Sequence, residues 1–195
     1  LIFWTIEAAK KSRFIDEVYV SSEDDEILEI SKKFGASILK RPPELSEDET
    51  SSDQVISHFL NNLEKTYSIN TVCFLQPTSP LRTAKHIDDA YDYFIQKNLK
   101  GLISGYYMQN NEFLKSFKVC SHGKIEGLIS ADSPFVRRQD LPKTFMANGA
   151  LYLFRPNDFK HENKIPRSGM NLYEMSEDSS LDIDTYSDLN FKKGK

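Results

Sequence analysis

The most useful absences in this sequence are long apolar runs, clustered cysteines and a basic stripe. No segment approaches the roughly 18 apolar residues that cross a bilayer, so no membrane-spanning helix is predicted. The two cysteines, Cys73 and Cys120, lie far apart, and Cys73 falls in an apolar run where we expect a small buried side chain. Lysines and arginines are scattered among acids, and the net charge is −4, which argues against a nucleic-acid partner.

Several catalytic and targeting signals are also missing. The four histidines lack the spacing of metal ligands, and the serines lie outside any nucleophile elbow, which argues against a zinc site or a hydrolase triad. Residues 1–6 are apolar, but no basic segment precedes them and Glu7 interrupts them, so they do not resemble a signal peptide. We therefore expect a cytoplasmic protein, and the length of 195 residues predicts one domain, 1–195.

The first half of the sequence alternates between extended runs and segments with helical spacing. Extended runs occupy 17–22, 36–39, 71–75 and 101–107, and helical spacing occurs at 2–9, 23–34, 53–67 and 83–97. Ser22 is the predicted N-cap of the second helix, and Gly35 the residue that ends it. This alternation predicts an α/β fold, with a mostly parallel sheet and helices on both faces.

The second half is less regular. Residues 117–128, interrupted by His122-Gly123, predict a hairpin, and residues 149–154 predict a strand. Residues 156–159 predict one helical turn, and the weakly periodic residues 163–173 predict an excursion from the fold.

The most informative segment is the octet LQPTSPLR at residues 75–82. It follows the apolar strand and precedes a helix, which places it where open α/β sheets bind ligands. Pro77 and Pro80 fix φ, so the loop has little conformational freedom to lose on binding. Two hydroxyls, an amide and a guanidinium indicate a ligand-binding loop and not a packing segment.

An acidic pair, Asp182 and Asp184, is the second candidate. Alternation in an extended stretch points both carboxylates to one side, where they repel unless a cation neutralises them. Mg²⁺ prefers one or two carboxylates together with substrate phosphates. The alternative is a solvated acidic turn, which is commoner for an isolated D-x-D, but the octet favours the metal site.

Basic residues flank two further loops. Arg41 and Ser51 border a polar loop, and such side chains can bind a phosphate, a base edge or a ribose, although surface loops contain many of them. Arg137 and Arg138 precede a proline-braced turn that can hold an anion, with a salt-bridged surface as the alternative. Asn148 stands at the mouth of the strand that follows.

Together these segments resemble the acylneuraminate cytidylyltransferase family, which activates sialic-acid-type sugars as CMP-sugars. The matching segments cover essentially the whole chain and are 18–22, 41–52, 75–82, 138–142, 148–150 and 182–184. The resemblance implies a Rossmann-like nucleotide-diphospho-sugar transferase fold that uses CTP and Mg²⁺. It also implies transfer of CMP to the anomeric hydroxyl of a nonulosonic acid with release of pyrophosphate, in a homodimer formed through an excursion near 155–175.

The resemblance also assigns roles to residues by position. The implied catalytic residues are Arg138, Asp182 and Asp184, and the two aspartates are the implied Mg²⁺ ligands. The implied nucleotide contacts are Arg41, Ser51 and Ser52. The implied substrate contacts are Gln76, Thr78, Ser79, Lys115, Arg138 and Asn148.

The sequence departs from the family at two places. Members open with a strand and a glycine- and lysine-bearing loop that cradles the CTP phosphates, whereas this sequence opens directly on helical spacing; we therefore expect little activity from the chain as given. Met146 stands where sialic-acid-specific members often carry arginine, which favours another acceptor, such as legionaminic or pseudaminic acid. Two alternatives stay open: an inactive or regulatory homologue that does not bind CTP, and a sugar nucleotidyltransferase with a different acceptor.

Overall fold

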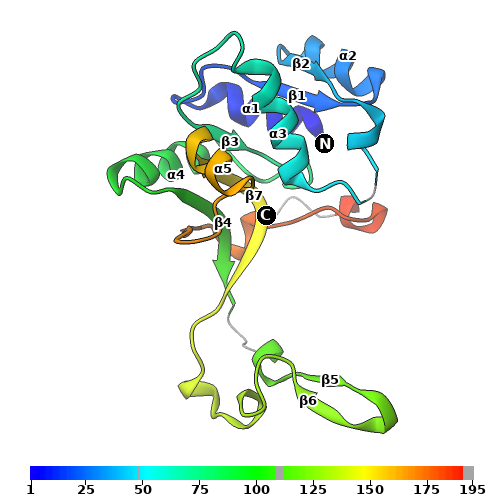
Figure 1. The fold of residues 1–195 in the computed structure, drawn as a ribbon, viewed down its shortest axis with the longest axis vertical. Helices are drawn as coiled ribbons and strands as arrows, with labels where there is room; N and C mark the ends of the chain where they lie inside the picture. The colour runs from blue at the N-terminus through cyan, green and yellow to red at the C-terminus, as the bar shows by residue number, and fades with distance from the viewer. Residues whose placement is uncertain (48, 109–111, 191–195) are drawn as a thin grey trace. The chain divides into compact units, whose positions relative to one another are not determined.

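The computed structural model describes residues 1–47, 49–108 and 112–190, which belong to two compact units (Figure 1). Unit 1 combines Leu1–Gly105 with Ala147–Lys195, and unit 2 is Tyr106–Met146. Unit 2 is therefore an insertion in the sequence of unit 1, and each unit is described by itself. None of the described helices is both long and apolar enough to cross a membrane.

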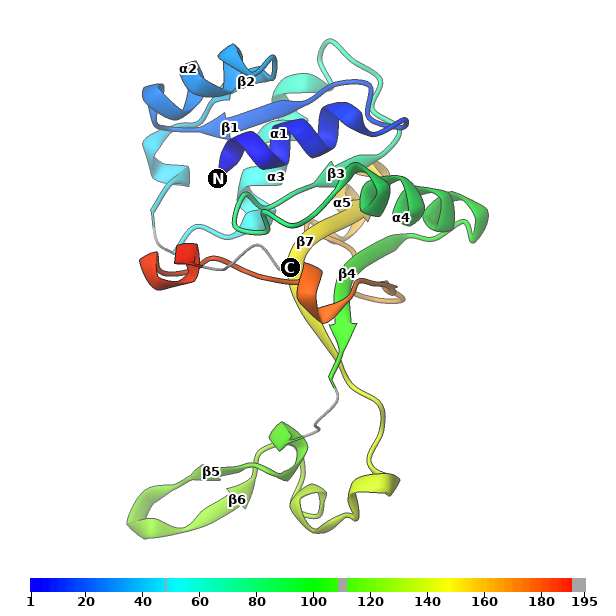
Figure 2. The ribbon, with the colours of Figure 1, turned by 180° about the vertical axis from the view of Figure 1, so that it is seen from behind.

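The helices and strands of unit 1 follow the alternation predicted for the first half of the sequence (Figure 2). Its helices are α1 (Ile2–Lys11), α2 (Asp25–Lys33), α3 (Ser52–Leu63), α4 (Ala84–Gln96) and α5 (Pro156–Glu162). Its strands are β1 (Tyr19–Ser22), β2 (Ser37–Lys40), β3 (Val72–Phe74), β4 (Gly101–Tyr107), β7 (Phe145–Phe154) and β8 (Asn171–Glu174), of which β4 and β7 extend into unit 2.

The strands form two sheets in unit 1. Strands β1 and β2 pair in parallel, and the second sheet has the order β3-β7-β4-β8. Strand β8 runs parallel to β4, but β7 runs antiparallel to β3. The predicted mostly parallel sheet is therefore mixed at β7, because β7 follows unit 2 directly and no helical crossover precedes it.

Helices cover both faces of the second sheet, as the sequence predicts. Successive side chains of β7 point to opposite faces, so Leu151 and Leu153 lie on one face and Phe154 on the other. The leucines belong to a cluster with Ala8 and Ala9 of α1 and with Ile87, Ala90 and Phe94 of α4. Phe154 belongs to a cluster with Ile56 and Leu60 of α3 and with Phe159 of α5.

The start of α2 differs from the expectation. Asp24, and not Ser22, is the N-cap, because its carboxylate accepts hydrogen bonds from the backbone N–H groups of Glu26 at 2.7 Å and Ile27 at 3.1 Å. A carboxylate also complements the positive end of the helix dipole, which a serine hydroxyl does not. Ser22 ends β1 and accepts from the Asp24 N–H at 3.2 Å. Gly35 follows the helix with a φ of +80°, as predicted.

The expected excursion at 155–175 lies inside unit 1 as α5 and β8, and the separate compact unit is Tyr106–Met146. Strand β8 is short and extends the sheet as the parallel neighbour of β4. Its four residues, Asn171–Glu174, alternate too briefly to be recognised from sequence.

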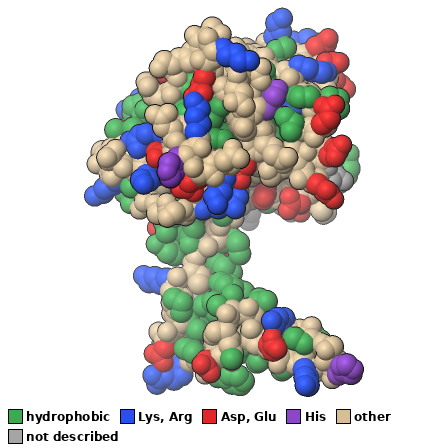
Figure 3. Space-filling view, in the orientation of Figure 1, with side chains coloured by type: hydrophobic (Ala, Val, Ile, Leu, Met, Phe, Trp, Pro, Cys, Tyr) green, Lys and Arg blue, Asp and Glu red, His purple; other side chains and the backbone are tan. Residues whose placement is uncertain are grey.

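Unit 2 contains the predicted hairpin, formed by β5 (Phe117–Val119) and β6 (Ile125–Gly127). Many of its apolar side chains are exposed, with Val119 at 80% and Phe135 at 77%. Figure 3 shows apolar side chains gathered on this unit. A surface of this kind marks an interaction site more often than an ordinary exterior.

The corrected cap of α2 is directly testable. Asp24→Ala is expected to lower the free energy of unfolding by about 1 kcal/mol, because two helix N–H groups lose their acceptor. Chemical denaturation measures the change, and Asp25→Ala, one residue into the helix, is the matched control. An equal loss in both variants would contradict the assignment.

Candidate functional site

The octet joins β3 to α4 and packs onto unit 1 by two of its side chains. Ser79 is 1% exposed and donates its hydroxyl hydrogen bond to the Asn148 carbonyl at 3.2 Å. Arg82 is 3% exposed and donates to the carbonyls of Gln76 and Ala150. These anchors leave Gln76 and Thr78 half-buried at the surface of the loop. The predicted position of the loop between a strand and a helix is confirmed, whereas the prediction that it is not a packing segment is wrong for Ser79 and Arg82, whose side chains are buried within the protein. Ligand binding by the loop stays a prediction.

Gly149 explains how closely the octet approaches β7. Its φ of +68° favours glycine, and a Cβ at this position would lie 2.1 Å from Gln76 Oε1. The same point lies 3.9 Å from Asp182 Oδ2. The Gln76 amide, the Gly149 backbone and the Asp182 carboxylate therefore meet at one place, although they come from three distant parts of the sequence.

Asn148 is buried, and the protein itself uses its side chain. Its Oδ1 accepts hydrogen bonds from Ser104 Oγ at 2.7 Å and from the Ala150 N–H at 3.1 Å. Its Nδ2 donates to Ser180 Oγ at 2.8 Å. Asn148 thus connects β4 and β7 to the segment that leads into the acidic pair, and its implied role as a substrate contact stays a prediction.

The acidic pair is attached to the octet. The Ile183 N–H donates to the Thr78 carbonyl at 2.9 Å, and the Ile183 side chain is buried. Asp182 and Asp184 are both exposed, as the alternation of this segment predicts. Among the described residues, no group of three His, Cys, Asp or Glu side chains could hold a metal ion. A cation at this pair would therefore need further ligands from a bound molecule.

Tyr152 of β7 lies near Asp182, and it was not identified from the sequence as a candidate site residue. Burial raises the pKa of its hydroxyl, and the nearby Asp182 carboxylate raises it further. Its ring packs against Phe74 with centroids 5.7 Å apart. The phenol therefore stays protonated at neutral pH and can donate a hydrogen bond beside the carboxylate. Its position one residue after Leu151, on the opposite face of β7, is the signal that could have identified it.

The implied nucleotide contacts lie in a different part of unit 1. Arg41 follows β2 and donates from Nη2 to Glu23 at 2.6 Å and from Nε to Ser46 Oγ at 3.0 Å. The Arg41 hydrogen bond lowers the pKa of Glu23 to about 2. Ser51 is the N-cap of α3, where its hydroxyl accepts from the Gln54 N–H at 3.3 Å, and Ser52 begins the helix.

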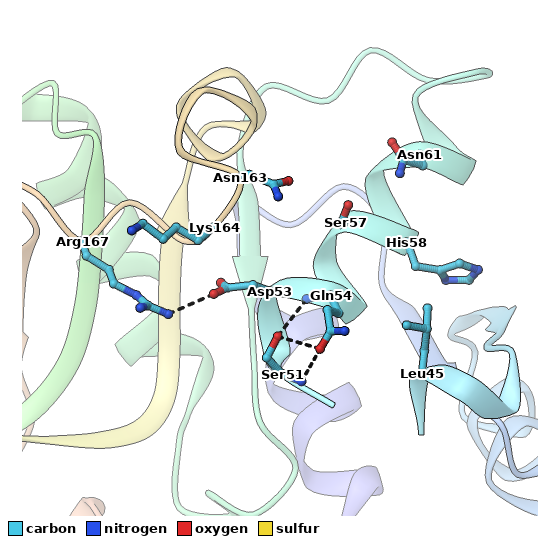
Figure 4. A pocket seen from close by; sticks show the side chains of 10 residues that line it. All are labelled: Leu45, Ser51, Asp53, Gln54, Ser57, His58, Asn61, Asn163, Lys164 and Arg167. Carbon is cyan, nitrogen blue, oxygen red and sulfur yellow. Dashed lines mark hydrogen bonds and ion pairs between the residues drawn. The ribbon is translucent and has the colours of Figure 1, made fainter. Parts of the chain in front are cut away.

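A hollow in unit 1 borders this region and not the octet. It has a volume of about 560 Å³ and is lined by residues of α3 and of the loop after α5, as Figure 4 shows. Ser51 is one of its lining residues, and across it Asp53 Oδ2 forms an ion pair with Arg167 Nη2 at 2.9 Å. Its described lining includes neither the octet nor the acidic pair.

Two implied substrate contacts belong to unit 2. Lys115 Nζ donates to the carbonyls of Pro134 at 3.1 Å and Val136 at 2.5 Å, so the ammonium holds a loop of its own unit. Arg138 is exposed at the start of a short 3₁₀ helix. Its neighbour Arg137 pairs with Asp140 at 2.6 Å, as in the alternative of a salt-bridged surface.

Comparison with known proteins places this fold and its motifs in a family. The sequence matches the cytidylyltransferase family over residues 1–189. A relative described as N-acylneuraminate cytidylyltransferase of Streptococcus agalactiae is 30% identical, and the match covers 97% of this chain and 45% of the relative. The chain thus spans less than half the length of that relative. A pseudaminic acid cytidylyltransferase of Campylobacter jejuni is 31% identical, over 99% of this chain and 83% of the relative.

Solved structures show the same fold at low identity. A CMP:2-keto-3-deoxy-manno-octonic acid synthetase in complex with CTP aligns with a TM-score of 0.62 at 14% identity, covering 88% of this chain and 77% of that chain. A 4-diphosphocytidyl-2C-methyl-D-erythritol synthase from Anaerococcus prevotii aligns with a TM-score of 0.61 at 11% identity, covering 96% of this chain and 82% of that chain. The α/β fold and the match over nearly the whole sequence show that this chain belongs to the cytidylyltransferase family.

Proposed function

We propose that this protein transfers CMP from CTP to the anomeric hydroxyl of a nonulosonic acid. The hydroxyl oxygen forms a bond to the α-phosphorus, the bond from that phosphorus to the pyrophosphate oxygen breaks, and the hydroxyl proton passes to solvent. The observation that carries the proposal is the meeting of Gln76, Gly149 and Asp182 at the carboxyl end of β3. Family membership and relatives described as acting on such sugar acids support it.

The acidic pair fits a divalent cation that is also held by phosphates. Asp182 and Asp184 are both exposed in a segment fixed through Ile183 and Ser180. Two carboxylates with phosphate oxygens form the oxygen-rich donor set that Mg²⁺ prefers. When bound, the ion would neutralise charge on the phosphates. The hydrogen bond from the Ile183 N–H to the Thr78 carbonyl fixes the segment that carries the two carboxylates beside the octet.

Two side chains of unit 1 would bind and orient the sugar acid. The Gln76 amide can donate to and accept from sugar hydroxyls, and the protonated Tyr152 phenol can donate to an oxygen near Asp182. By the family resemblance alone, Met146, which belongs to unit 2, stands where sialic-acid-specific members often carry an arginine, and a methionine offers no charged donor to an anion. This favours an acceptor such as pseudaminic or legionaminic acid, and the Campylobacter jejuni relative is described as acting on pseudaminic acid.

A homodimer formed through unit 2 is also part of the proposal. The exposed apolar side chains of this unit include Phe117, Val119, Ile125, Ile129 and Phe135. Burying them against a second copy would remove from water an area that a monomer leaves exposed. A cytoplasmic location is consistent with the nucleotide substrate.

The metal ligands are tested by calorimetry. Asp182→Asn and Asp184→Asn are each expected to weaken Mg²⁺-dependent CTP binding about tenfold or more, a loss of ~1.4 kcal/mol, because a charged oxygen ligand becomes neutral. Asp178→Asn, an exposed acid in the preceding 3₁₀ turn, is the matched control and should bind like the wild type.

If the wild-type protein, produced from its complete reading frame, gives no heat with CTP and Mg²⁺, the regulatory alternative replaces the proposal. If CMP transfer occurs but pseudaminic, legionaminic and N-acetylneuraminic acids are all refused, the alternative with another acceptor is correct.

The dimer is tested by sedimentation. Val119→Glu combined with Phe135→Glu is expected to convert the dimer to a monomer, because the interface would bury two unpaired carboxylates. Ile27→Glu changes an exposed apolar residue of α2 in unit 1 and should leave the dimer intact. A wild-type protein that stays monomeric at high concentration rules out this part of the proposal.

A further inference from the structure

Arg82 links three separate segments of unit 1. Its Nη1 donates to the carbonyls of Gln76 at 3.0 Å and Ala150 at 2.7 Å, and its Nη2 donates to Thr5 Oγ1 at 2.7 Å. Gln76 belongs to the octet, Ala150 to β7 and Thr5 to α1. A single side chain therefore fixes the spacing between the octet, the central strand and a helix that covers the sheet.

Burying the charged guanidinium of Arg82 costs desolvation free energy, which a residue that only fills space would not need to lose. Arg82 is 3% exposed, and it donates its hydrogen bonds to backbone carbonyls and a hydroxyl, not to a carboxylate. Its Nε is buried without a hydrogen-bond partner among the described residues. Burial lowers the pKa of the guanidinium to about 10, so it remains charged at neutral pH. A methionine would fill the volume without this desolvation, so the arginine adds the orientation of two carbonyls.

Both carbonyls flank the place where the site converges. One belongs to Gln76, whose side-chain amide lies against Gly149, and the other belongs to Ala150, the residue after Gly149. Arg82 thus holds both sides of the contact between the octet and β7. A small change in their separation would move the Gln76 amide relative to Asp182.

We propose that Arg82 is the positioning residue for Gln76, which it holds against Gly149 so that the amide faces the sugar acid. The geometric part of this inference rests on the contacts above, and its effect on turnover rests on the proposed function. Arg82 acts through Gln76 and does not itself touch the substrate.

A double-mutant cycle tests the coupling. In protein from the complete reading frame, Arg82→Lys is expected to raise the KM for the nonulosonic acid about tenfold and to leave the KM for CTP within about twofold. In a Gln76→Ala background it should have no further effect on that KM, because the positioned group is gone. If the effects of the two substitutions add, or if both KM values stay at wild type while only the melting temperature falls, Arg82 has a purely structural role.

Two further variants keep the test decisive. Arg155→Lys is the matched control, because Arg155 also holds a backbone carbonyl, that of Leu99 at 2.6 Å, and its hydrogen bonds among the described residues go to Leu99 and Asn98 and not to the octet or Ala150; it should change neither KM. Gly149→Ala displaces the Gln76 amide from the other side without disturbing the buried charge, and should reproduce the rise in KM for the sugar acid. If Arg82→Lys does not fold, Gly149→Ala still tests whether displacing the Gln76 amide raises the KM for the sugar acid.

The side-chain amide resonance of Gln76, assigned by its loss in Gln76→Ala, gives a readout that does not require activity. It is expected to shift in Arg82→Lys and Gly149→Ala and to stay in place in Arg155→Lys. An unmoved resonance in the first two variants overturns the positioning role. If the resonance shifts in these variants but the wild-type protein shows no CMP transfer, the positioning role of Arg82 stands and the proposed function is wrong.

Discussion

The geometry of the site depends on satisfying the buried polar groups where the octet meets β7. Ser79, Arg82, Ser104 and Asn148 are all buried there, and each donates to or accepts from a partner in a distant segment. A buried polar group that loses its partner costs more free energy than one in water, so losing any of these partners would be destabilising. Arg82 Nε is the exception in this group, because it is buried without a hydrogen-bond partner among the described residues. The octet, the central strand and the acidic segment consequently hold one another in place.

Local sequence patterns predicted the parts of the fold that depend on local physics. The spacing of apolar residues indicated the helices, and the alternation around Ile183 is found as a buried isoleucine between two exposed aspartates. Local sequence patterns could not predict which partner each polar side chain bonds. Ser22 and Asp24 are both good cap residues in sequence, and only the backbone path decides that the aspartate caps α2. Likewise, the insertion of unit 2 between β4 and β7 has no compositional boundary.

The same chemical groups that bind ligands also stabilise the chain, which limits what residue type can show. The Ser51 hydroxyl caps a helix, the Ser79 hydroxyl bonds a carbonyl, and the Lys115 ammonium holds two carbonyls of another loop in unit 2. Gln76 and the acidic pair differ because their polar groups are left at the surface of a fixed framework. The octet and the D-x-D spacing singled out Gln76, Asp182 and Asp184 as candidates, whereas the approach of Gln76 and Asp182 to Gly149 needed the structure.

The insertion of unit 2 has a consequence for synthesis of the protein. Strand β7 lies between β3 and β4 in the sheet, yet the ribosome makes unit 2 after most of β4 and before most of β7. The sheet therefore lacks its central neighbour while unit 2 emerges, and the apolar sides of α1 and α4 have no Leu151 and Leu153 to pack against. Closing this long-range pairing requires a large loop to form first, which slows folding. The newly made amino-terminal part should accordingly depend on chaperones until β7 has left the ribosome.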